Sequence, residues 1–410
     1  MTALVFNCQY NGLSIIQELG RRGVTVLALD SIRSVGTYSR YAHFYKCPDP
    51  QVAEDAFIEY LFKLGPSFMD KPVLFPTNDP WAIALSRHKE RLSQYYLPCV
   101  ADPSVVELIV QKQRFNEWAL EQGLPIPQSW RSDAISEIPD NAFPIVAKPE
   151  CRRISSNEKS TSLRAAALDQ LRLTILENHS DLTQFMSQHI ELIPYFIFQE
   201  YVAGLSDCMY TIGVYADRDH VVKGMFTGRK VRGFPPDIGD CIVGQVEAVP
   251  EKLKILVKDV CKSIGYHGIA EFEFKRDAIT GQFKLIEINP RSWSWIGITP
   301  ACGVSLPWIV YADLTKVESI PYTESNLPAG NVKYVKVIQD MQNCLYRNRQ
   351  AGFPDWGMTI LQWWKSLKAN RLVCAEFAKD DPGISIYAIA SFLKSIVCVA
   401  LRRVIRGKSH

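Results

Sequence analysis

The sequence lacks the residue patterns of common metal and redox sites. Its eleven cysteines are scattered without a CxxC pair, and its seven histidines form no cluster. Zinc sites need such spacings, so none is expected. The chain enters a strand pattern directly after Met1, so a cleaved signal peptide is not expected. Reduced thiols in a cytoplasmic protein are the simplest interpretation.

Two further absences narrow the function. The first hundred residues contain no GxGxxG fingerprint, which argues against a dinucleotide cofactor. A net charge of +3 over 410 residues gives no nucleic-acid signature. A hydrophobic content of 47% and a charged content of 22% are ordinary for a globular protein with a sizeable core. The length favours two or three domains.

The most informative stretch is Gly268 to Arg291, GIAEFEFKRDAITGQFKLIEINPR. With a two-residue period, 269–275 and 283–289 are predicted strands joined by a turn. Burying ionised carboxylates without a partner costs a large desolvation free energy, or the groups become protonated. The pattern therefore indicates a cation that keeps them ionised. Carboxylate and amide oxygens, without His or Cys, suit Mg²⁺, which completes its shell with substrate phosphates. One predicted face carries Glu271, Glu273, Glu287 and Asn289, and the other carries Phe272, Phe274, Ile286 and Ile288.

This ribbon, which ends in Glu287-Ile288-Asn289-Pro290-Arg291, resembles the metal-binding core of the ATP-grasp superfamily, whose members include many carboxylate-amine ligases. The resemblance implies that Glu273, Glu287 and Asn289 bind Mg²⁺, with Mn²⁺ as an alternative ion. It also implies that Arg291 faces a phosphoryl group transferred from ATP. A solvated hairpin is the other interpretation, so residues elsewhere in the chain decide between them.

Two lysines precede the ribbon in the order that the family shows. Lys112 lies in a helical pattern over 105–122. Lys148 ends a short apolar run over 143–148 that reads as a buried strand. Each lysine alone is more often a surface residue. The resemblance implies that both bind the phosphates of ATP.

A third segment, 196–204, is an apolar strand that turns polar in its middle and ends at a glycine. In the family this strand links the two lobes and reads adenine through its backbone. The resemblance implies that Glu200 and Val202 take those positions and that Asp207 holds the ribose hydroxyls. The pattern is weak evidence by itself because many strands share it.

A cluster of cations lies between the adenine strand and the ribbon. The segment 227–233 has three basic residues between two glycines and is predicted to be a loop. Such runs are usually solvated, but at this position Arg229 or Lys230 is expected to contact phosphate or an acyl phosphate. The sequence does not distinguish the two. The family's glycine-rich lid is replaced by 151–161, which has no glycine and is expected to be a polar lid.

Three domains are expected, in a mixed α/β and α+β fold. Residues 1–103 alternate strands and helices, which predicts a doubly wound parallel sheet. Residues 104–320 would form a two-lobed ATP-grasp domain, and residues 321–410 a helical C-terminal extension. The elements expected in the first domain are strands at 3–6, 25–30 and 73–75 and helices at 12–23 and 80–92.

Several residues outside these motifs could contact substrate. The segment 292–295 lies directly after the ribbon and would line the acceptor pocket or the core. His267 beside the ribbon is expected to be structural rather than a base. Aromatic packing is expected around Trp356, Trp363 and Trp364. Polar residues at strand ends or loops of the first domain, each also suited to turns or caps, are Asn7, Asn11, Tyr38, Ser39, Arg40, Asn78 and Asp79.

The C-terminus is apolar over 384–401 but carries Lys394 near its centre, so a spanning helix is disfavoured. At helical spacing the segment has an apolar stripe that includes Ile389, Leu393 and Ile396. The stripe either packs on the protein or another subunit of an oligomer, or lies on the inner face of an anionic membrane beside Arg402.

Together these features predict an ATP-dependent, ADP-forming ligase that joins a small-molecule carboxylate and an amine through an acyl phosphate. Two lysines, Mg²⁺ and Arg291 supply the positioning and charge neutralisation that phosphoryl transfer needs. The alternatives are another ATP-grasp phosphorylation or carboxylation, or a catalytically silent nucleotide-binding protein. The identities of the carboxylate and the amine are not fixed by the sequence.

Overall fold

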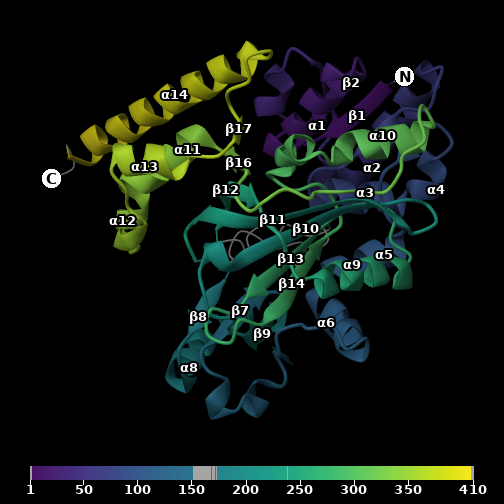
Figure 1. Cartoon of the computed structure of the whole chain (residues 1–410). Helices are drawn as coiled ribbons and strands as arrows, with labels where there is room; N and C mark the ends of the chain where they lie inside the picture. The colour runs from purple at the N-terminus through teal and green to yellow at the C-terminus, as the bar shows by residue number, and fades with distance from the viewer. Residues whose placement is uncertain (1, 151–167, 169–170, 172, 238, 408–410) are drawn as a thin grey trace.

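The computed structural model describes residues 2–150, 168, 171, 173–237 and 239–407. Figure 1 shows the N-terminal domain beside a large sheet, a smaller sheet below it, and the C-terminal helices at one side. The predicted lid over 151–161 lies outside the described residues.

The N-terminal domain is a parallel sheet with strand order β3-β2-β1-β4-β5. Helix α1 covers one face, and α2 and α3 cover the other. The predicted doubly wound sheet is confirmed. The predicted helix at 80–92 is wrong in one respect, because the backbone leaves helical geometry at His88 and divides it. The elements are β1 (Thr2–Phe6), α1 (Tyr10–Arg21), β2 (Thr25–Asp30), β3 (Ala42–Lys46), α2 (Pro50–Leu64), β4 (Val73–Phe75), α3 (Asp79–Arg87), α4 (Lys89–Leu92) and β5 (Leu97–Pro98).

The predicted helix over 105–122 is also two helices. Helix α5 (Pro103–Val110) and helix α6 (Lys112–Glu121) are separated by Gln111, whose φ of −88° and ψ of 99° are extended. The break places Lys112 at the first position of α6, where helical N–H groups and the helix dipole favour an anion nearby.

A small sheet forms one lobe beyond these helices. Its strand order is β6-β9-β7-β8, and every pair is antiparallel. A separate apolar cluster, centred on Phe185, Phe196 and Phe198, packs beneath it. The elements are β6 (Ser129–Arg131), β7 (Ile145–Pro149), β8 (Thr174–Leu176), α8 (His179–Gln188) and β9 (Phe196–Glu200).

The large sheet forms the second lobe, with the order β14-β13-β10-β11-β12-β16-β17 and β15 paired to β11. The segment 227–233 lies inside β11, so its prediction as a loop is wrong. Its charges are carried by a strand whose neighbours supply their partners. The elements are β10 (Met209–Ala216), β11 (Val222–Phe234), β12 (Asp240–Val246), α9 (Glu251–Ser263), β13 (Gly268–Arg276), β14 (Phe283–Asn289), α10 (Leu306–Thr315), β15 (Thr323–Glu324), β16 (Val332–Val335) and β17 (Arg371–Cys374).

The predicted acidic ribbon is the antiparallel pair β13 and β14. Its apolar face is confirmed for Phe272, Phe274 and Ile288, which lie in the main core. It is wrong for Ile286, because a register shift after Glu273 changes the alternation. Leu285 takes the core position instead, and Ile286 lines the cavity described below.

The N-terminal domain and the large sheet share their cores. One cluster joins the α2 and α3 side of the domain to β10, β13 and α9. A second joins the α1 side to α10 and to the two tryptophans that follow β14. The domain is therefore packed against the large sheet through continuous apolar surfaces.

The indole rings of those two tryptophans pack directly on glycines of the large sheet. Trp293 and Trp295 are each 1% exposed. A Cβ on Gly213 of β10 would lie 2.0 Å from Cη2 of Trp293, and one on Gly244 of β12 would lie 2.4 Å from Cε3 of Trp295. Glycine is required here because an indole ring occupies the space of a side chain.

The C-terminal extension is not only helical, since β16 and β17 add to the large sheet. The remaining elements are α11 (Val337–Gln342), α12 (Asn348–Gln350), α13 (Ile360–Ser366) and α14 (Pro382–Gly407). Trp363 is buried as predicted, whereas Trp364 is 66% exposed. In the part of the chain that the structure describes, no helix has the length and apolarity to cross a membrane.

Helix α14 begins against the N-terminal domain. Asp381, directly before it, accepts hydrogen bonds from the side chains of Gln17 and Ser39 and from the backbone of Arg40. Tyr387 stacks on Tyr38 at a centroid distance of 4.2 Å. In Figure 1 the helix then runs toward the free C-terminus. Ser39 and Arg40, which the sequence offered as substrate contacts, instead hold this helix.

We expect Gly213→Ala to lower the free energy of unfolding by about 1–3 kcal/mol, because the added methyl group overpacks the core against Trp293. Urea unfolding followed by circular dichroism would measure the loss. In a Trp293→Leu background the same substitution should cost less. An equal loss in both backgrounds would contradict this packing.

Candidate active site

The acidic face of the ribbon lies at the centre of a cavity of about 730 Å³ between the two lobes and the N-terminal domain. Residues opposite each other in the ladder are Glu271 with Asn289 and Glu273 with Glu287. Glu271, Glu273 and Asn289 are each less than one-tenth exposed. The period-two pattern therefore brings three carboxylates and one amide together in a largely buried place.

Hydrogen bonds and ion pairs organise these acids. Glu271 accepts from Thr211 Oγ1 at 3.0 Å and from Asn289 Nδ2 at 3.1 Å. Lys230 Nζ lies 2.7 Å from Glu273 Oε1. Asn289 Oδ1 in turn accepts from Arg291 Nη2 at 3.0 Å. The ribbon and its neighbouring strands thus orient Glu271, Glu273 and Asn289.

The charge of the site favours an additional cation. Burial raises the pKa of Glu271 to about 8, and the Glu273 carboxylate adds to the effect. Burial also raises the pKa of Glu273. Burial would lower the pKa of Lys230, but the carboxylates of Glu273 and Glu271 raise it above its usual value. The charges of Lys230 and Arg291 lower the pKa values of both acids without cancelling the effect of burial, so a divalent cation would stabilise their ionised form.

The oxygen-bearing side chains of the ribbon suit a Mg²⁺ ion that is shared between the protein and a substrate. Within the residues that the structure describes, no three His, Cys, Asp or Glu side chains form a ready metal cluster. Glu273, Glu287 and Asn289 offer two carboxylates and an amide oxygen on one face. Mg²⁺ commonly takes one or two carboxylates and receives the rest of its shell from phosphates and water.

Arg291 connects the ribbon to the N-terminal domain. Its Nε donates to Asp79 Oδ1 at 2.7 Å, and its Nη1 donates to the Ser292 carbonyl at 2.9 Å. Asp79 begins α3, and both residues line the cavity. The contact joins residues 212 positions apart, so no local pattern could have predicted it.

Both predicted lysines reach the same cavity. Lys112 Nζ donates to the Pro149 carbonyl at 2.6 Å, which brings the start of α6 to the end of β7. Lys148 on β7 is buried and lines the cavity opposite the acidic ribbon. The structure therefore brings together the two lysines, the ribbon and Arg291, as the sequence predicted.

Of the three residues predicted to contact adenine or ribose, two line the cavity and one does not. Glu200 and Val202 line the cavity. Glu200 Oε2 also accepts from the Gln128 N–H at 3.0 Å and from Lys284 at 3.2 Å. Asp207 does not line the cavity, and its carbonyl accepts from Arg229 at 3.0 Å. Its predicted contact with ribose thus receives no support from the geometry.

The neighbours Arg229 and Lys230 point to different places on β11. Lys230 lines the cavity and pairs with Glu273. Arg229 does not line it, and pairs with Glu247 at 3.3 Å. The structure thus distinguishes two residues that the sequence could not, because consecutive strand residues face opposite sides.

Sequence reasoning passed over some cavity residues. Period two places Glu271 on the acidic face, although the resemblance assigns it no role in metal binding. Lys275 on the same strand and Asp237 after β11 also line the cavity. Trp293 and Trp295 belong to the core and also border the cavity, so both interpretations of that segment hold.

The chain matches no protein-family model. It is 26% identical over 288 residues to a D-aspartate ligase from Enterococcus faecium, and the match covers 66% of each chain. A biotin carboxylase domain from Hydrogenobacter thermophilus, solved with MgADP and bicarbonate, has a TM-score of 0.57 and 15% identity, covering 81% of this chain and 73% of that one. An L-amino acid ligase from Bacillus licheniformis has a TM-score of 0.54 and 16% identity, covering 77% and 74%.

The chain has the ATP-grasp fold. The two lobes with a cavity between them and the N-terminal parallel sheet are the arrangement that the sequence predicted. The MgADP in the biotin carboxylase structure shows that this fold can hold a nucleotide together with Mg²⁺.

His267 lies outside the cavity. It is 4% exposed, and its Nδ1 lies 3.2 Å from the Val100 carbonyl. Burial lowers the pKa of His267 from 6.5 to about 4. The sequence interpretation of a structural histidine agrees with this position.

We expect the stability of the protein to fall as the pH drops from about 6.5 to about 4, because only the unfolded state protonates His267 in that window. His267→Gln should remove on the order of 3 kcal/mol of this pH dependence. Urea unfolding at pH 7 and pH 4.5 would measure the difference. If His267→Gln showed the same difference in unfolding free energy between pH 7 and pH 4.5 as the wild type, a buried neutral imidazole would be contradicted.

Proposed function

We propose that this chain is an ATP-dependent, ADP-forming carboxylate-amine ligase that makes an amide bond through an acyl phosphate. One observation carries the proposal: the buried acids of the ribbon share a cavity with Lys230, Arg291 and two further lysines. The relative named as a D-aspartate ligase supports ligation over the other reactions of this fold.

The nucleotide would lie between the lobes. Lys112 and Lys148 would hold the α and β phosphates, and the chain at Glu200 and Val202 would read adenine. Glu273, Glu287 and Asn289 would hold Mg²⁺, which supplies charge neutralisation at the β and γ phosphates when bound. Such positioning is the main demand of phosphoryl transfer, which needs little covalent help from the protein.

Lys230 and Arg291 would act on the transferred phosphoryl group. A carboxylate oxygen of the first substrate attacks the γ phosphorus, the bond to the β-phosphate oxygen breaks, and ADP leaves. The cationic side chains would stabilise the negative charge that is spread over the equatorial oxygens. The salt bridge between Arg291 and Asp79 would keep the guanidinium in place during this step.

The second step forms the amide. The amine nitrogen attacks the carbonyl carbon of the acyl phosphate, phosphate leaves with the C–O electron pair, and the nitrogen releases a proton. The wall of the cavity in the N-terminal domain is rich in amide groups, which suit a polar substrate; it includes Asn7, Gln9, Asn11, Thr77 and Asn78. An amino acid is the first candidate for the carboxylate, with D-aspartate among those to be tested.

The alternatives are other reactions of the fold. Carboxylation would show ATP use that depends on bicarbonate and not on an amine. A silent nucleotide-binding protein would bind ATP without turnover. The presence of Glu273, Glu287 and Asn289 on one face of the cavity favours an active enzyme over the silent alternative.

We expect Glu287→Gln to lower ADP release by roughly 10²-fold or more, because it removes a negative ligand from the metal position and so weakens stabilisation of the transition state. The measurement is a coupled ADP assay over pairs of amino acids and amines with Mg²⁺, first on the wild-type chain.

The matched control is Glu247→Gln, an acid directly after β12 that pairs with Arg229 and does not line the cavity. Its activity should stay near that of the wild type. No turnover by the wild type with any pair, together with ATP affinity that Glu287→Gln leaves unchanged, would overturn the ligase proposal.

We further propose that α14 contacts an anionic membrane surface. Ile386, Ile389 and Leu393 are 69%, 46% and 55% exposed. From 382 to the C-terminus the sequence has basic residues but no Asp or Glu. Ile396 and Arg402, which complete the predicted stripe and its basic flank, lie outside the described side chains. Amphipathic helices with basic flanks bind anionic lipid surfaces.

We expect the full chain to float with vesicles that contain phosphatidylglycerol and not with pure phosphatidylcholine, because binding needs both apolar burial and charge. A chain that ends at Tyr387 keeps the packing of Ile384 and Tyr387 on the N-terminal domain, lacks Ile389, Leu393 and the basic residues that follow, and should not float. Equal flotation of both chains, or of neither, would contradict the contact.

A further inference from the structure

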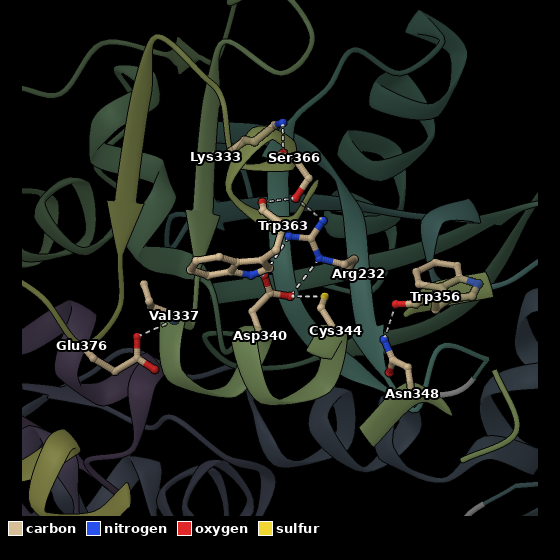
Figure 2. A network of polar contacts seen from close by, with 10 residues as sticks. All are labelled: Arg232, Lys333, Val337, Asp340, Cys344, Asn348, Trp356, Trp363, Ser366 and Glu376. Atoms are coloured by element: carbon tan, nitrogen blue, oxygen red, sulfur yellow. Dashed lines mark hydrogen bonds and ion pairs between the residues drawn. The ribbon is translucent and has the colours of Figure 1, made fainter. Parts of the chain in front are cut away.

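A buried ion pair ties β11 to the C-terminal extension (Figure 2). Arg232 Nε and Nη2 donate to the two oxygens of Asp340 at 2.8 and 2.7 Å. The two side chains are only 5% and 1% exposed. A two-bond contact between a guanidinium and a carboxylate fixes orientation as well as distance.

Further partners hold this pair from several sides. Trp363 Nε1 donates to Asp340 Oδ2 at 2.7 Å, and Cys344 Sγ donates to Asp340 Oδ1 at 3.6 Å. Arg232 Nη1 donates to Ser366 Oγ at 3.0 Å. In Figure 2 these side chains converge from β11, α11, α13 and the π-helical turn Asn343–Arg347 that follows α11. A buried network with its polar groups paired in this way is rigid.

The helix that carries Asp340 is itself anchored. Glu376 Oε2 accepts from the Val337 N–H at 2.8 Å, which caps the start of α11. Tyr10 of the N-terminal domain donates to Glu376 Oε1 at 3.4 Å. The position of Asp340 is thus fixed relative to the N-terminal domain as well as to the large sheet.

A bulge separates Arg232 from the cavity. In a regular strand Lys230 and Arg232 would lie on the same face. Here Lys230 is opposite Gly244 and Arg232 is opposite Val243, so Val231 is an extra residue in β11. Lys230 enters the cavity, whereas Arg232 enters the extension. Bulges beside active sites commonly re-aim a side chain in this way.

We propose that Arg232 and Asp340 are positioning residues, which hold the bulge at Val231 so that Lys230 points at the transferred phosphoryl group. This inference rests on the proposed function, because it requires Lys230 to act on that group. It assigns to the C-terminal extension a part in catalysis, although Arg232 and Asp340 do not line the cavity.

The chemistry of the pair supports this role over simple stabilisation. Burying two charges costs desolvation energy, and apolar residues of similar volume often stabilise a core equally well. A guanidinium and carboxylate fork, in contrast, allows one geometry only. A bulge is a place where register can slip, so a contact with defined geometry two residues from Lys230 is useful there.

The decisive variant replaces both partners by apolar residues, Arg232→Met with Asp340→Leu. This change leaves no buried charge unpaired and should keep cooperative unfolding. We expect kcat to fall by about 10²-fold, as for a small misplacement of a catalytic group, with a much smaller change in KM for ATP.

The matched control is Arg21→Gln with Asp380→Asn, which removes an exposed ion pair between the extension and the N-terminal domain. The control should keep the wild-type kcat.

A mutant cycle tests whether the effect passes through Lys230. In a Lys230→Met background the double substitution should lower kcat no further, because the residue that it misplaces is already gone. A full additional loss in that background would overturn the proposal. A wild-type kcat in the double variant would also overturn it.

A crystal structure of the double variant separates this inference from the ligase proposal. If the wild type shows no turnover, the ligase proposal fails, and the structure still tests the positioning. We expect the bulge to shift and Lys230 to leave Glu273, with which it is in contact at 2.7 Å here. An unchanged contact would overturn the proposal. If the double variant does not fold, Arg232→Lys keeps the charge, loses the fork, and should lower kcat in the same direction.

Discussion

The site depends on the balance between buried carboxylates and the cations that neutralise them. Glu271 and Glu273 share one face of a sheet, and their pKa values are raised because burial disfavours their charge. Lys230 and Arg291 oppose that effect from two other parts of the chain. We propose a triphosphate with its metal ion as the ligand of this site, because Mg²⁺ is held by carboxylates and phosphates together.

The ribbon could be predicted because the alternation of residues within two short neighbouring segments specifies it. Period two and a turn placed the acids on one face, and the structure agrees for Glu271, Glu273 and Glu287. The exception is Ile286, because a register shift depends on the partner strand and leaves no trace in the alternation. The parallel sheet of the first domain was predictable for the same reason, since strands and helices alternate along the chain.

The features that the sequence did not predict depend on contacts between residues far apart in the chain. The segment 227–233 looks like a solvated loop because the acids that pair with its three cations, Glu247, Glu273 and Asp340, all lie well beyond it in the chain. The break at Gln111 and the bond between Lys112 and the Pro149 carbonyl also depend on the meeting of two distant elements. The roles of Asp79 and Asp340 could not be inferred, because each acts through an arginine far away in sequence.

The bond between Asp79 and Arg291 also limits how this protein can be recombined. Exchange of the first domain for that of another protein would succeed only if the donor supplied a carboxylate at the start of the equivalent helix. Without it, the guanidinium would stay enclosed beside the ribbon and lose the carboxylate that accepts from its Nε, which would destabilise the fold. The domain boundary at this site is therefore a chemical junction, and chimeras would have to be designed across it as a matched pair.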